Sequence, residues 1–345
     1  MMMWTKKERL LSVLHGELAD RPPVSAWRHF QETEHSTPLD FAASMLIFQG
    51  KYDWDYIKMQ PRATYYEEAW GSEFDFSDYK GGNVPSSIKK SISGMQDLEK
   101  IVELPGNSGP FAEQLEAIQI IQKGVKDNTP IFQTIFCPSA VFQKLCAIDS
   151  IGRYRSATRS DLMITLFREH PELVHKALKN ITRTLANYSK EMAKIDTFGV
   201  FYAATGLSRT GYLTRDEWDE FVRPYDMELL EALMPLKVML HACGIYCNPE
   251  RFADYPIAIL HWAESAPGNP PLNSSPNWLK GKTPMGGVDE RLFGQNKSLE
   301  IVQVTRDTLK KMKKIPFVLA PDCSVDKNTS HEELMAFINT AHEAI

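Results

Sequence analysis

The chain has 345 residues, a formal net charge of −5 at pH 7 and 43% hydrophobic residues, which excludes a disordered, collagen-like or mucin-like chain. A sequence pI of about 6.0 argues against nucleic-acid binding, which usually requires a basic face. No apolar run approaches the ~18 residues of a membrane span, and the charged start does not match a signal peptide. We therefore expect a cytoplasmic protein whose five cysteines are free thiols or metal ligands.

The chain opens with a predicted amphipathic helix over residues 5–16, where Thr5 and Glu8 form a capping box. Short apolar runs then alternate with longer helical ones. Several of these apolar runs are typical of strands buried on both faces. The eight strands are predicted at residues 24–27, 55–59, 131–136, 198–203, 237–241, 257–262, 285–288 and 316–320. The main helices between them are predicted at residues 109–127, 161–167, 171–194, 214–233 and 299–313.

This alternation predicts an α/β fold in which residues 1–345 form one domain, a (β/α)8 TIM barrel with an N-terminal helical extension. Two stretches interrupt the pattern. Residues 68–91 are rich in Gly, Asp and aromatics and are expected to form a hairpin or lid. Residues 266–284 are rich in Pro and Asn and are expected to form a long loop over one barrel end.

One motif points to a metal site. His241 and Cys243 are two residues apart near a strand end, so their side chains share a face and point into the mouth of the barrel. Cys323 follows the last predicted strand and Glu264 follows an intervening one. These four residues are our candidate metal ligands, because imidazole, thiolate and carboxylate together suit Zn²⁺. Cys247 could compete as a ligand, although a bystander thiol fits its place before a predicted helix.

The charge of this site suggests a reaction. Zn²⁺ with two thiolates and a neutral imidazole carries no net charge. Such a site favours a bound thiolate nucleophile over a strongly polarised water, which implies alkyl transfer to a thiol. Glu264 either occupies the fourth position until the thiol displaces it or acts as a catalytic group just outside the metal shell.

Several segments carry a family resemblance. They are Glu8-Arg9-Leu10, residues 20–24, residues 55–58, residues 201–211 and residues 220–225. Through them the chain resembles the uroporphyrinogen decarboxylase superfamily over almost its full length, which implies a single (β/α)8 barrel. Within that superfamily, His241-x-Cys243 with Cys323 resembles the zinc motif of the methylcobalamin:coenzyme M methyltransferase branch. With Glu264 added, the order is similar to the zinc set of cobalamin-independent methionine synthase.

The resemblance implies a zinc-dependent methyltransferase. Its cofactors would be Zn²⁺ and a methylcorrinoid such as methylcobalamin, free or on a partner corrinoid protein. The acceptor would be a small-molecule thiol or a related compound, and coenzyme M, homocysteine and a pterin all remain open. The chain departs from the decarboxylases, which have an Arg-rich element where it has Trp27-Arg28-His29-Phe30, and a Gly-His-Gly turn where it has Asp322-Cys323-Ser324. Tetrapyrrole decarboxylation is the alternative, and a non-enzymatic zinc or corrinoid carrier is a third reading.

Further polar residues near strand ends are candidates for the pocket. His29 and Asp289 are expected as catalytic pocket residues together with Glu264. His261 is expected to face away from the mouth. The candidates for contacts with a sulfonate, a carboxylate or a corrinoid amide are Lys58, Gln60, Arg62, Gln133 and Tyr202. The simpler interpretation is that several of them are interior polar residues paired with one another.

Overall fold

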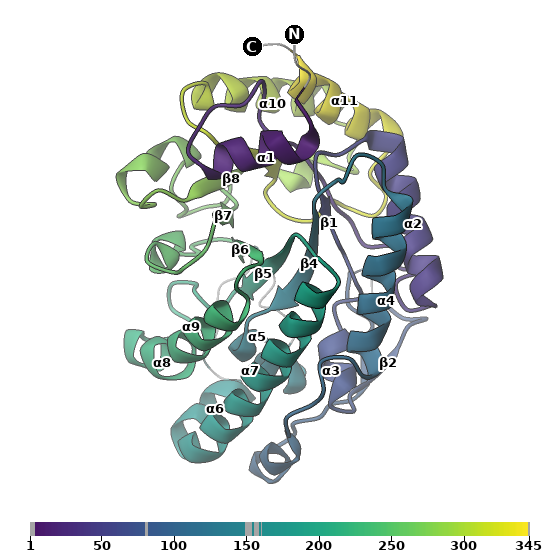
Figure 1. Cartoon of the computed structure of the whole chain (residues 1–345). Coiled ribbons are helices and arrows are strands. Elements are labelled where there is room, and N and C mark those ends of the chain that lie inside the picture. The colour runs from purple at the N-terminus through teal and green to yellow at the C-terminus, as the bar shows by residue number, and fades with distance from the viewer. Residues whose placement is uncertain (1–3, 80–81, 149–153, 155–158, 160, 344–345) are drawn as a thin grey trace.

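The computed structural model describes residues 4–79, 82–148, 154, 159 and 161–343. A curled parallel sheet of seven strands lies at its centre, surrounded by helices (Figure 1). In spatial order the strands are β1 (Ile57–Lys58), β4 (Ile131–Phe136), β5 (Gly199–Thr205), β6 (Lys237–Ala242), β7 (Ile259–Trp262), β8 (Thr283–Val288) and β9 (Val318–Pro321). The helices are α1 (Lys6–Leu14), α2 (Pro38–Tyr52), α3 (Tyr65–Ala69), α4 (Gly109–Gly124), α5 (Pro138–Leu145), α6 (Leu162–Glu169), α7 (Pro171–Lys194), α8 (Arg215–Phe221), α9 (Arg223–Ala232), α10 (Ser298–Met312) and α11 (His331–His342).

Local sequence signals account for several helix boundaries. The capping box of Thr5 and Glu8 forms as expected and starts α1. The predicted helix over residues 214–233 is instead two helices, α8 and α9, with a break at Val222. Pro224 explains the break, because it has no backbone N–H and its ring hinders continuation of the preceding turn.

The expectation of eight regular strands is only partly met. Residues 24–27 make a single parallel bridge, between Val24 and Leu319, rather than a strand. The segment nevertheless lies between β9 and β1, because Leu319 N donates to Pro23 O at 2.9 Å and Asp55 N donates to Val24 O at 3.0 Å. Pro22 and Pro23 lack the N–H groups that a longer ladder requires.

Alternation along the strands separates two cores. One set of side chains fills the inside of the curled sheet, and it includes Phe132, Phe201 and Met239. The residues between them on the same strands point outward against the helices, as Leu240 does. This period of two decides which polar side chains of a strand can reach the interior.

The two irregular stretches have different roles. Strands β2 (Glu73–Asp75) and β3 (Ser86–Lys89) pair antiparallel, which confirms the predicted hairpin within the described residues. Residues 82–85 form the described end of the hairpin connection, and Gly82 lies against the rest of the fold, since Gln31 Nε2 donates to Gly82 O at 2.7 Å. Residues 266–284 contain the 3₁₀ turn Leu272–Asn277, which packs against β8 and α10. The start of this stretch lies against the segment after β6, since Tyr246 N donates to Pro267 O at 2.8 Å.

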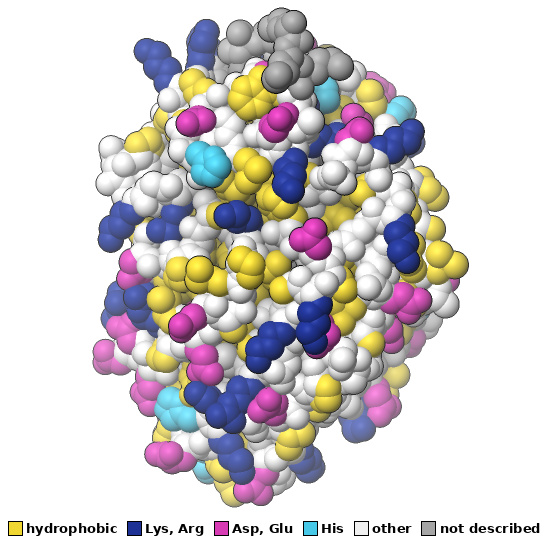
Figure 2. Space-filling view, viewed as in Figure 1, with side chains coloured by type: hydrophobic (Ala, Val, Ile, Leu, Met, Phe, Trp, Pro, Cys, Tyr) yellow, Lys and Arg dark blue, Asp and Glu magenta, His cyan; other side chains and the backbone are white. Residues whose placement is uncertain are grey.

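The surface is mixed in charge. Acidic and basic side chains are interspersed over the face that Figure 2 shows, with hydrophobic side chains between them. Among the described helices, none is long and apolar enough to cross a membrane.

Candidate functional site

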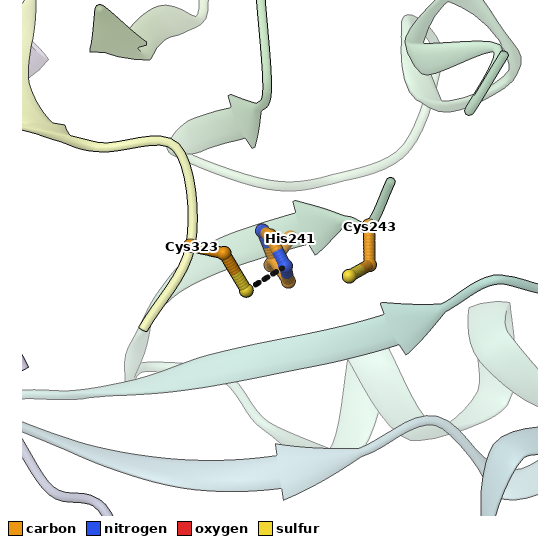
Figure 3. A group of neighbouring side chains, drawn as sticks. All are labelled: His241, Cys243 and Cys323. Atoms are coloured by element: carbon orange, nitrogen blue, oxygen red, sulfur yellow. Dashed lines mark hydrogen bonds between the residues drawn. The ribbon is translucent and has the colours of Figure 1, made fainter. Parts of the chain in front are cut away.

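His241, Cys243 and Cys323 converge at one end of the sheet (Figure 3). His241 lies on β6, Cys243 directly follows that strand, and Cys323 follows β9. One ligand atom from each lies within 4.8 Å of the other two, and Cys323 Sγ is 3.6 Å from His241 Nε2. Within the described part of the chain this is the one group of three or more His, Cys, Asp and Glu side chains with such geometry.

The separation of Cys323 Sγ and His241 Nε2 fits a tetrahedral zinc site. With Zn–S near 2.3 Å and Zn–N near 2.0–2.1 Å, tetrahedral angles place the nitrogen and sulfur about 3.6 Å apart. The observed separation of Cys323 Sγ and His241 Nε2 has this value. His241 is 5% exposed, whereas both cysteines are partly exposed toward a cavity. Three protein ligands on a cavity wall are typical of a catalytic zinc site, which keeps one coordination position for substrate.

The backbone before Cys323 is anchored by Asp322. Its buried carboxylate accepts hydrogen bonds from Gly287 N and Ser265 N, both at 3.1 Å. Burial raises the pKa of Asp322 to about 7. The close approach of β8 to β7 requires glycine at position 286. Gly286 has φ +137°, and a Cβ there would lie 2.8 Å from Trp262 O on β7.

His241, Cys243 and Cys323, the candidate metal-ligand group, lie in the wall of a cavity of about 920 Å³, a volume that includes its open mouth. The cavity is lined by aromatic, cationic and polar side chains from several strand ends and from the hairpin connection. They include Trp27, His29, Lys58, Gln60, Arg62, Asn83, Lys144, Phe201 and Thr205.

A directional hydrogen-bond chain supports one side of this cavity. Lys58 Nζ donates to Gln60 Oε1, so the amide nitrogen of Gln60 faces His29 Nε2, at 2.8 Å. His29 Nδ1 then lies 2.8 Å from the buried carboxylate of Glu34. This order assigns the proton of the His29 ring to Nδ1. The Lys58 ammonium lies 4.5 Å from the centre of the Phe201 ring. The cavity wall thus contains three of the residues predicted for the pocket, namely His29, Lys58 and Gln60.

Two further cations of the cavity, Arg62 and Lys144, have carboxylate partners. Arg62 binds Glu68 and Glu113, in each case with a shortest N–O distance of 2.8 Å. Lys144 Nζ lies 3.4 Å from Glu67 Oε1. Burial raises the pKa of Glu67, and the charge of Lys144 partly offsets that rise.

Glu264 and Asp289 are not brought to the metal-ligand group. Glu264 accepts hydrogen bonds from Leu272 N at 2.8 Å and Lys311 Nζ at 2.5 Å, so its carboxylate is directed toward α10. The chain turns directly after β7, which redirects this side chain. Asp289 pairs with Arg291, with an N–O distance of 2.7 Å, and does not line the cavity among the described residues.

Gln133 and Tyr202 lie on the outer face of the sheet. Gln133 Nε2 donates to Tyr188 OH on α7 at 3.0 Å, and Tyr202 OH donates to Asp226 Oδ1 on α9 at 2.6 Å. Their strand neighbours Phe132 and Phe201 take the inward positions. Their expected contacts with a corrinoid or substrate are therefore corrected to contacts with helices.

His261 lies on the inner face, contrary to expectation. It is in register with His241 on the adjacent strand, and the two rings are 4.6 Å apart. Burial is the main cause that lowers the pKa of His261 well below its ordinary value, so the ring is neutral. No local motif in the sequence marks Lys144, Glu34 or Thr205, because a helix, a turn and a bulged strand end bring them to the site.

Comparisons with known proteins support a family assignment. The model of the uroporphyrinogen decarboxylase (URO-D) family matches residues 5–344. Two methylcobamide:CoM methyltransferases MtbA, from Methanosarcina acetivorans and Methanosarcina mazei, are each 22% identical over 264 residues, covering 72% of this chain and 73% of the relative. The names of these relatives agree with the predicted class of methyltransferase and with the predicted resemblance to that branch.

Solved structures agree with the fold. A methyltransferase from Methanosarcina mazei aligns with a TM-score of 0.80 and 19% identity, covering 99% of both chains. A B12-independent methionine synthase from Shewanella sp. W3-18-1 aligns with a TM-score of 0.53 and 11% identity, covering 88% of this chain and 85% of the other. At these identities the likeness concerns the fold alone.

Proposed function

This chain belongs to the uroporphyrinogen decarboxylase family, and within that family we propose that it transfers a methyl group from a methylated corrinoid to a thiol. The observation that carries the proposal is the convergence of His241, Cys243 and Cys323 at the wall of the cavity. The names of the MtbA relatives support the corrinoid as donor and a thiol as acceptor.

In this proposal His241, Cys243 and Cys323 would hold Zn²⁺, and the cavity beside them would admit the acceptor. The ion would supply a positive centre that stabilises the thiolate form of the acceptor near neutral pH. The neutral His261 ring packs against His241 and limits its rotation. In the overall reaction the acceptor sulfur gains the S–C bond, the cobalt–carbon bond breaks with its electron pair left on the corrinoid, and the thiol proton is released.

Lys58 is the proposed contact for an anionic group of the acceptor. Its ammonium faces the Phe201 ring, which in turn lies 5.4 Å from the His241 ring, between centroids. Gln60, His29 and Glu34 hold this ammonium in place through the hydrogen-bond chain. We therefore propose a positioning role for His29 and Gln60, and a binding role for Lys58.

The open mouth of the cavity is the proposed entry for the donor, either free methylcobalamin or a corrinoid on a partner protein. The hairpin connection, which contributes Asn83 and Val84 to the lining, would lie beside the incoming corrinoid. We also propose that residues 24–27 occupy the eighth strand position and complete the barrel around this cavity.

The test is a transfer assay on zinc-loaded protein, with methylcobalamin as donor and coenzyme M, homocysteine or a tetrahydropterin as acceptor. We expect methylated thiol, and a loss of at least ~100-fold in rate for Cys243→Ala. Tyr202→Phe is the control, since Tyr202 contacts α9 outside the cavity. No transfer to any thiol would refute the proposal, and CO₂ release from uroporphyrinogen would replace it with the decarboxylase alternative.

A further inference from the structure

Thr205 has an unusual backbone conformation at the end of β5. Its φ is +50°, in the left-handed region that β-branched residues almost never adopt. The register of β5 against β6 shifts between Ala203 and Thr205, so Ala204 is the extra residue of a bulge. Bulges and strained conformations of this kind are concentrated at functional sites.

The hydroxyl of Thr205 is the second unusual feature. The residue is 9% exposed, and its Oγ1 is buried without a hydrogen-bond partner among the described residues. It lines the cavity together with Cys243. The two residues are also joined through the backbone, because Cys243 N donates to Thr205 O at 3.0 Å.

Packing alone does not account for threonine here. Glycine would adopt the positive φ without steric cost, and valine would fill the same volume without burying an unpaired hydroxyl. Threonine combines both penalties at one position in the cavity wall. A ligand that hydrogen-bonds the hydroxyl would remove the second penalty.

We propose that Thr205 is an acceptor-binding residue whose hydroxyl donates a hydrogen bond to the thiol compound bound beside Cys243. This inference rests on the proposed function and deepens it. Thr205 is more than nine-tenths buried and lies next to a metal ligand, so it contacts the small acceptor rather than a corrinoid at the open mouth. The acceptor accordingly carries a hydrogen-bond-accepting atom within reach of both Cys243 and Thr205.

The matched variants are Thr205→Val, which keeps the shape and the branching, and Thr205→Ser, which keeps the hydroxyl. In steady-state kinetics with the best thiol, we expect Thr205→Val to raise the thiol KM at least ~5-fold and to leave the methylcobalamin KM unchanged. Thr205→Ser should stay within ~2-fold of the wild type. The unliganded Thr205→Val protein should unfold at the same or a higher temperature, because an unpaired buried hydroxyl is removed.

Each outcome has a distinct meaning. An unchanged thiol KM in Thr205→Val, while the wild type transfers methyl groups, overturns the role of Thr205 and leaves the proposed function intact. If the wild type transfers no methyl group, the proposed function fails. Thermal shifts with coenzyme M and homocysteine then still test Thr205: a shift in the wild type that Thr205→Val lacks supports it, and equal or absent shifts overturn it.

Discussion

Replacing Asp226 with asparagine should remove a loss of stability that the wild type suffers as pH rises. Asp226 lies on α9, fully buried, and accepts hydrogen bonds from Tyr202 OH at 2.6 Å and Tyr255 OH at 3.2 Å. Burial raises its pKa from 3.8 to about 7, and the two hydroxyls only partly oppose that rise.

The sign follows from the two protonation states. Between pH 4 and 7 the folded protein retains the proton on Asp226, whereas the unfolded chain has lost it. The contribution of Asp226 to stability is therefore fully present below pH 4. It declines as the pH rises, until the pH passes the pKa that Asp226 has in the folded protein. At about 1.36 kcal/mol per pKa unit, the total loss is about 4 kcal/mol. About 3 kcal/mol of that loss falls between pH 5 and pH 8.

Urea denaturation of the wild type and Asp226→Asn at pH 5 and pH 8 measures this difference. We expect the stability of the variant relative to the wild type to rise by about 3 kcal/mol from the lower to the higher pH. Asp307→Asn, at an exposed position of α10, is the control and should show no such change. Equal pH dependence of the wild type and Asp226→Asn would refute the reasoning.

Three further predictions concern the site. Glu264→Gln should retain zinc, measured by mass spectrometry, and should lose at most about 1 kcal/mol of stability, because the carboxylate pairs with Lys311 instead of the metal-ligand group. Lys58→Met should raise the KM of an anionic thiol at least ~10-fold but leave that of 2-mercaptoethanol nearly unchanged; equal effects on both would contradict a charge contact. Gln133→Leu should leave methylcobalamin kinetics within ~2-fold of the wild type, because Gln133 contacts α7.

The convergence of His241, Cys243 and Cys323 was predictable because it depends on short-range rules. His241 and Cys243 share a face through the period of two in a strand, and Cys323 follows the end of another strand of the same parallel sheet. A parallel sheet brings such ends to one edge, so a motif scattered over 80 residues of sequence still converges. The helix caps and the hairpin were predictable for the same reason.

The wrong predictions concern side chains whose direction depends on a turn or on a difference of one position along a strand. Tyr202 and Gln133 each lie one position from an inward-facing residue, so the sequence alone did not distinguish the two faces of a strand buried on both sides. Glu264 follows a turn that redirects its side chain to Lys311. Glu34 and Thr205 depend on tertiary contacts and on a bulge, for which the residue types give no local signal.

Zinc content tests the central claim most directly. Wild-type protein, purified without chelator, should contain about one zinc ion per chain, and Cys243→Ala and Cys323→Ala should each lose it. Cys247→Ala should retain it, because this buried cysteine lies outside the metal-ligand group. A wild type without zinc even after incubation with the ion, or Cys243→Ala and Cys323→Ala variants that retain a full equivalent, would contradict a zinc-dependent methyl transfer at this site.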